Sequence, residues 1–166
     1  MQPFWLYVEI QPTLDRPDVF LATTKFSAEP EPYRDLLLFP EAEPGHVMMV
    51  ARLHHRLRCR GVPPLGNMGT NEGRYFYDLG LGLAKAAPKL SPVRAPVPGS
   101  FWGELRQALD ELHQHGFVHG NVREHTIAVT DQGAPVLFDL LSAQPASSVG
   151  RRSDWAALDA MRRRVE

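Results

Sequence analysis

Cysteine is almost absent from this sequence, which has only Cys59 among its 166 residues. An internal disulfide therefore cannot form and a zinc site built on cysteines is excluded, as is common in a reducing compartment. Long hydrophobic runs are missing too, and the first ten residues have no basic region followed by an apolar stretch. We therefore expect no membrane span and no secretory leader, and we expect a cytoplasmic protein.

An excess of charge of one sign is also lacking, because 18 lysines and arginines face 19 aspartates and glutamates. Such a balance produces no overall positive field, so we expect neither nucleic acid nor an anionic membrane as the partner. Hydrophobic residues make up 43% of the chain and charged residues 22%, values typical of a globular protein. At this length they indicate one compact domain or two small lobes.

The pattern of the first half predicts an antiparallel sheet with one helix. Aromatic and β-branched runs predict strands, and prolines between them predict turns. Apolar residues at helical spacing, with basic residues near the end, predict the helix. The expected strands are residues 4–10, 19–26, 36–39 and 74–79, the helix is 41–58, and the turns lie at 11–18 and 71–73.

The second half is predicted to be mostly helical with one hairpin. Residues 81–99 are rich in Gly, Ala and Pro, which indicates a junction between lobes or, alternatively, a long surface loop. Ser100 is expected to cap one helix and Ser153 to cap the last one. Between these helices, residues 126–130 and 135–138 flank an Asp-Gln-Gly turn, a pattern typical of a hairpin.

A short motif in the second half is the most informative part of the chain. His119-Gly120-Asn121 is followed by Arg123 and Thr126, then by the expected hairpin, and then by Asp139-Leu140-Leu141. This order and spacing resemble the catalytic loop and the metal-binding segment of the protein-kinase-like superfamily, in which H-R-D or H-G-D precedes D-F-G. The glycine variant is found in relatives such as the bacterial serine/threonine and lipopolysaccharide-type kinases.

The resemblance implies an α+β fold with two lobes. Residues 1–84 would form an N-lobe with an antiparallel sheet of five strands and one helix, and residues 85–99 the hinge. Residues 100–166 would form a shortened, mostly helical C-lobe, because the family's remaining C-lobe helices have no counterpart before Glu166.

The resemblance also implies a role for each motif residue. His119 would be structural and lie beneath the loop. Asn121 stands in place of the catalytic aspartate, and an amide cannot ionise to act as a base. Arg123 takes the place of the lysine that reaches the transferred phosphoryl group. Thr126 and Asp139 stand at the positions that bind magnesium and, through it, ATP, where the hydroxyl is the weaker ligand.

Two aspartates have a simpler alternative interpretation. Asp139 is expected in the cleft between the lobes, but a carboxylate at a strand end often only accepts hydrogen bonds from a turn. Asp154 resembles the aspartate that fastens the catalytic-loop backbone in the family, but it also suits the first turn of a helix. The arginines at 151–152 and 162–164 are interpreted as a solvated face, with contact to an acidic partner as the alternative.

Several parts of the family's phosphate-binding machinery are missing. Residues 11–18, where its glycine-rich loop belongs, contain no glycine; the strand at 36–39 has no lysine; and Val50 stands near the position of the ion-pairing glutamate. Phosphoryl transfer depends on these groups for positioning and charge stabilisation. We therefore predict a pseudokinase that acts as a regulatory or scaffolding module for a protein partner.

Two other functions stay open from the sequence. One is an active, divergent ATP-dependent phosphotransferase in which Asn121 orients the acceptor while Asp139 and Arg123 hold magnesium and phosphate. The other is a metal-binding domain, because four histidines fall within one short stretch, namely His113, His115, His119 and His125. The sequence identifies neither the partner nor the oligomeric state.

Overall fold

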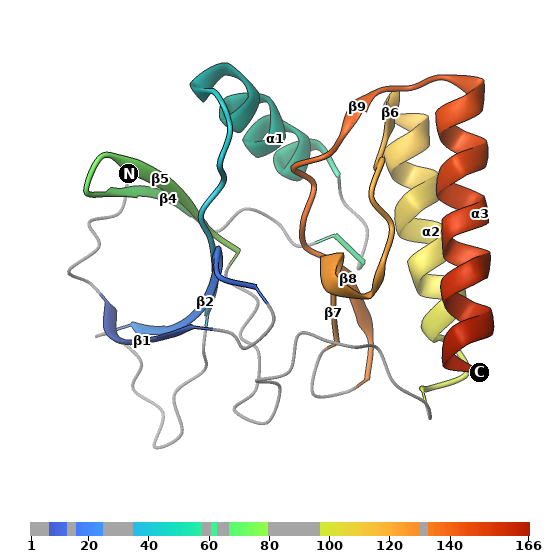
Figure 1. Ribbon diagram of the computed structural model, residues 1–166, viewed down its shortest axis with the longest axis horizontal. Coiled ribbons are helices and arrows are strands. Elements are labelled where there is room, and N and C mark those ends of the chain that lie inside the picture. Colours follow the sequence, from blue (N-terminus) through green and yellow to red (C-terminus); the bar gives the residue numbers. More distant parts are fainter. Residues whose placement is uncertain are drawn as a thin grey trace.

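The computed structural model describes residues 7–12, 16–24, 35–57, 61–62, 67–79, 97–129 and 133–166. They form an antiparallel sheet with one helix beside it, followed by a mostly helical part (Figure 1), which confirms the predicted α+β class. Within these ranges, no helix has both the length and the apolar character needed to cross a membrane. Only the last three residues of the expected hinge at 85–99 lie inside the described ranges, so the lobe boundaries stay a prediction.

Five strands form the sheet, in the spatial order β1-β2-β3-β5-β4, and all neighbouring strands are antiparallel. They are β1 (Tyr7–Pro12), β2 (Val19–Thr24), β3 (Asp35–Leu38), β4 (Asn67–Asn71) and β5 (Arg74–Asp78). The prediction that the first turn starts at Gln11 is wrong, because Gln11 and Pro12 still pair with β2. Proline is tolerated there because β1 is an edge strand and Pro12 is its last residue. The expected strand residues 4–6 and 25–26 lie outside the described ranges.

Helix α1 (Pro44–Arg56) follows β3 and buries one face against the sheet. Val47 and Val50 are buried in the core, and Tyr77 of β5 donates a hydrogen bond of 2.6 Å to the carbonyl oxygen of Val47. The helix is shorter than the predicted range of 41–58. It begins at Pro44, whose fixed φ suits a first helical position, and it ends before Leu57, which has an extended conformation.

The second part contains two long helices and two short strand pairs. Helices α2 (Phe101–Gln114) and α3 (Ser148–Val165) lie side by side (Figure 1). The predicted hairpin is formed by β7 (Ile127–Val129) and β8 (Pro135–Leu137), after a 3-10 turn at Glu124–Thr126. Strands β6 (Phe117–Val118) and β9 (Gln144–Pro145) form the other pair.

The prediction that Ser153 caps α3 is wrong, because the helix starts earlier, at Ser148. Ser147 is the N-cap, and its hydroxyl oxygen accepts a hydrogen bond of 2.9 Å from the backbone N–H of Gly150. This contact satisfies one of the N–H groups that a helix start leaves without an intrahelical partner. Ser100 does stand at the N-cap of α2, as predicted, although its side chain makes no capping hydrogen bond.

One hydrophobic core runs through both parts of the molecule. It joins Leu21 and Leu38 of the sheet to Leu105 of α2, Leu137 of β8 and Met161 of α3. The sheet and the helical part therefore share buried apolar surface, which is the main favourable contribution to folding. This shared core connects β2, which follows Arg16 and Asp18, to the part of the chain that contains the loop after α2.

Gly61 lies at a close contact between the segment after α1 and helix α2. A Cβ atom built on Gly61 would lie 2.7 Å from Cβ of Ala108. We therefore expect Gly61→Ala to lower the free energy of unfolding by about 1–3 kcal/mol through overpacking, as measured by urea denaturation. Gly103→Ala, in the first turn of α2, is the control, because its Cβ would meet nothing within 4 Å and alanine favours the helix over glycine by at most about 1 kcal/mol. Equal effects at the two positions would contradict the close contact.

Candidate functional site

Asp154 fastens the loop that follows α2 to helix α3. Its carboxylate oxygen Oδ2 accepts a hydrogen bond of 2.7 Å from the backbone N–H of His119 and lies 2.8 Å from Nε2 of His113. The other oxygen, Oδ1, accepts a hydrogen bond of 3.0 Å from the backbone N–H of Gly120. Because α3 begins at Ser148, Asp154 lies in its second turn and the first-turn alternative is wrong. The predicted role of Asp154 as the anchor of the loop backbone is confirmed.

His119 and Gly120 give this loop its shape. Gly120 has a φ of 76°, and a Cβ there would lie 3.0 Å from the carbonyl oxygen of Ser142, so a glycine is needed. His119 is fully buried, and its Nδ1 accepts a hydrogen bond of 3.2 Å from the backbone N–H of Asn121. Burial lowers the pKa of His119. This favours the neutral ring, whose Nδ1 can accept the hydrogen bond from Asn121.

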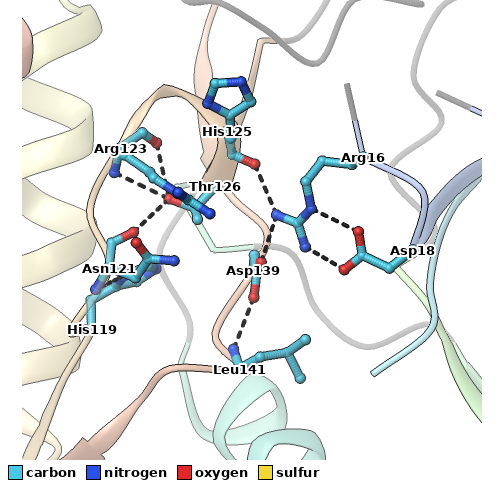
Figure 2. Close-up of polar contacts among 9 residues, drawn as sticks. All are labelled: Arg16, Asp18, His119, Asn121, Arg123, His125, Thr126, Asp139 and Leu141. Atoms are coloured by element: carbon cyan, nitrogen blue, oxygen red, sulfur yellow. Dashed lines mark hydrogen bonds and ion pairs between the residues drawn. The ribbon is translucent and has the colours of Figure 1, made fainter. Parts of the chain in front are cut away.

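Thr126 closes the same loop through backbone contacts (Figure 2). Its Oγ1 lies 3.0 Å from the carbonyl oxygens of both Asn121 and Arg123, and it accepts a hydrogen bond of 3.3 Å from the N–H of Arg123. Thr126 is fully buried, whereas Asn121 is half-buried and Arg123 is exposed. The hydroxyl that was expected to face a metal is therefore engaged by the loop itself.

Asp139 lies just after strand β8 and is only 6% exposed. Its Oδ1 accepts a hydrogen bond of 3.0 Å from the backbone N–H of Leu141, as a turn carboxylate does. Its Oδ2 lies 2.8 Å from Nη1 of Arg16, which belongs to the turn between β1 and β2. Asp139 thus stabilises its own turn and also contacts the turn that precedes β2.

Arg16 is held by two carboxylates and one carbonyl group (Figure 2). Its Nε and Nη2 contact the two carboxylate oxygens of Asp18 at 2.7 and 2.5 Å, and Nη1 donates to the carbonyl oxygen of His125 at 3.1 Å. Burial opposes ionisation of Asp18, but the hydrogen bonds and charge of Arg16 outweigh it and lower the pKa of Asp18 below its ordinary value. Since its side chain is 13% exposed, Arg16 is a largely buried cation between two anions.

Arg16, Asp18 and His46 are the site residues that the sequence did not predict. Arg16 and Asp18 flank Pro17, whose restricted φ is a local sign of an ordered turn, but nothing local connects this turn with Asp139. His46 of α1 places its Nε2 2.6 Å from the carbonyl oxygen of Leu141. Asp139 is therefore contacted by Arg16, and Leu141, two residues later, is contacted from α1.

The histidines of the expected metal cluster have separate environments. His113 contacts Asp154, His115 is exposed and its Nδ1 lies 2.9 Å from the carbonyl oxygen of Glu111, and His119 is buried beneath the loop. The described ranges contain no group of three or more His, Cys, Asp or Glu side chains placed to hold a metal ion. The structure therefore does not bring the predicted histidine cluster together.

Comparisons with known proteins assign this chain to no family. A scan against protein-family models finds no match to this chain, and no curated protein matches it significantly. Function is therefore argued from the residues of the chain and the contacts that they make.

Proposed function

We propose that this chain has a protein-kinase-like, two-lobe fold and acts as a pseudokinase: a regulatory or scaffolding module that binds a protein partner in the cytoplasm. Two features support the kinase-like part. Three strands, one helix and two further strands precede the helical part, which is the order of a kinase N-lobe. The contacts of Asp154 with the His119 loop are those that the resemblance implies.

The position of Arg16 is the observation that carries the proposal. In kinases the aspartate of D-F-G binds magnesium, whereas here a guanidinium group lies 2.8 Å from Asp139. The hydroxyl of Thr126, the other expected metal ligand, contacts backbone carbonyl groups instead. As they lie, these two residues do not fit Mg²⁺, and Asn121 has no ionisable group to act as a base. We therefore derive no phosphoryl-transfer step for this chain.

Thermal unfolding with and without ATP tests the proposal. A ligand that binds only the folded state at 100 times its Kd adds about 2.7 kcal/mol of stability, which raises the Tm of a chain of this size by roughly 5–10 °C. We expect no such rise at millimolar ATP, either with magnesium or with a chelator. The variant Asp139→Asn is likewise expected to show no rise in Tm when ATP is added.

A magnesium-dependent rise in Tm that Asp139→Asn abolishes would contradict the proposal. It would favour the divergent phosphotransferase, with Asp139 as the metal ligand and Arg123 as the phosphate contact. Metal analysis of the protein purified without an affinity tag tests the remaining alternative, because stoichiometric bound zinc would favour a histidine metal site.

A further inference from the structure

Helix α1 and strand β6 line a small pocket that reaches the core residue Leu53. The pocket has a volume of about 170 Å³ and is lined by Gly45, Met49, Arg52, Leu53, Arg56 and Phe117. The residues from α1 recur at helical spacing, so they form one stripe along the helix, and Phe117 comes from strand β6. None of these residues belongs to the Arg16–Asp139 contact.

The size and lining of this pocket suit one apolar side chain. Its volume is below the roughly 300–1,000 Å³ of pockets that bind small molecules. Met49, Leu53 and Phe117 supply apolar surface, and Met48 on the same helix is 45% exposed, one of the two large hydrophobic residues exposed in the described ranges. Methionine side chains adapt their shape to different apolar groups, which is why they are common at peptide-binding surfaces.

Arg52 and Arg56 place two positive charges along the pocket, one helical turn apart. Both are exposed, and neither forms an ion pair with another described residue. By contrast, Arg162 and Arg164 of α3 contact Glu166 and Glu124 at 3.0 Å. Arginines that have no acidic partner among the described residues favour an acidic partner from outside, because complementary charge steers and orients association.

We propose that this α1 pocket, defined by its six lining residues, binds an acidic segment of a partner protein. One apolar side chain of that segment enters the pocket, and its carboxylates face Arg52 and Arg56. The inference rests on the proposed scaffolding function, for which it supplies the partner's chemistry. Anionic lipid and nucleic acid match the charge but not the apolar pocket, so they are outcomes that the test separates.

Selection from a random peptide library displayed on phage, with the whole untagged chain immobilised, is the first step of the test. The expected consensus has several Asp or Glu residues around one Leu, Ile, Met or Phe.

The best peptide is then synthesised with a fluorescent label and titrated by anisotropy. Arg52→Glu and Arg56→Glu are each expected to weaken its binding roughly three- to tenfold, and alanine in place of its apolar residue is expected to weaken it at least as much. Arg163→Glu, the same charge change at the far end of α3, is expected to change Kd less than about twofold.

The proposal is overturned if the selection gives no acidic consensus with an apolar position. It is also overturned if Arg163→Glu weakens binding as much as Arg56→Glu, or if the alanine peptide binds as well as its parent. Binding of phosphatidylserine vesicles or single-stranded DNA with the same dependence on Arg52 and Arg56, but without a selected peptide, would assign the surface to another class of partner. The ATP experiment uses separate residues, so its failure and the failure of this proposal are distinguishable.

Discussion

Asp154→Ala is expected to lower the free energy of unfolding by about 3–5 kcal/mol. The carboxylate is 2% exposed, and its removal leaves three donors in the loop and in α2 without their acceptor, namely the N–H groups of His119 and Gly120 and the ring of His113. Burying a donor that has lost its partner costs about 1–3 kcal/mol each. Urea denaturation measures the loss, and faster hydrogen exchange at the His119 and Gly120 amides locates it.

Asp159→Ala is the matched control for this prediction, because Asp159 is exposed on the same helix. We expect this control to change stability by less than about 0.5 kcal/mol. Asp154→Asn keeps one acceptor oxygen but turns an amide donor toward the others, so an intermediate loss is expected. If Asp154→Ala were no worse than Asp159→Ala, the anchoring of the loop by Asp154 would be contradicted.

The elements of this fold are predictable from the sequence where their pattern is local. Helix α2 is correctly predicted because Leu105, Leu109 and Leu112 recur at helical spacing and all three are buried. Strands β6 and β9 were not predicted, because they have two residues each and depend on each other for pairing. The start of α3 cannot be predicted from the sequence, because Ser147 and Ser153 both suit an N-cap and only the structure shows that Ser147 is the one used.

The candidate site is predictable only in part for the same reason. The motif around His119 is read from residue order, and the role of Asp154 is implied by the resemblance that this motif carries. The contacts of Arg16 do not, because Arg16 donates to the carbonyl group of His125, 109 residues further along the chain. A contact over such a separation depends on how the β1–β2 turn is placed by the shared core, and no local propensity encodes it.

Arg16 also gives a physical reason why a carboxylate can be buried at Asp139. A buried carboxylate is costly unless it is paired and hydrogen-bonded. A metal ion supplies that pairing in a kinase, and the guanidinium group of Arg16 supplies it here, at 2.8 Å from Oδ2 of Asp139. The buried carboxylate of Asp139 is therefore explained by its pairing with Arg16, and it is not by itself evidence of metal binding.

This explanation predicts a strong energetic coupling between Arg16 and Asp139. In a double-mutant cycle of Arg16→Met and Asp139→Asn, urea denaturation is expected to give a coupling energy of about 1–3 kcal/mol. Arg16→Met alone should be the more damaging change, because it leaves two carboxylates without their cation while Asp139→Asn leaves Asp18 to pair with Arg16. The control is the exposed pair Arg74 and Glu41, which is 3.8 Å apart and is expected to show a coupling near zero.

The pH dependence of the Arg16→Met effect gives an independent check. Arg16 lowers the pKa of Asp18, so the stability that this pair contributes is present above the ordinary aspartate pKa of about 4 and is lost as the pH falls below it. The difference in unfolding free energy between wild type and Arg16→Met should therefore be constant from about pH 5 to 7 and shrink below about pH 4. A difference that stays constant through this range, or a coupling as small as that of Arg74 and Glu41, would mean that Arg16 is not the cation that balances the carboxylates of Asp18 and Asp139.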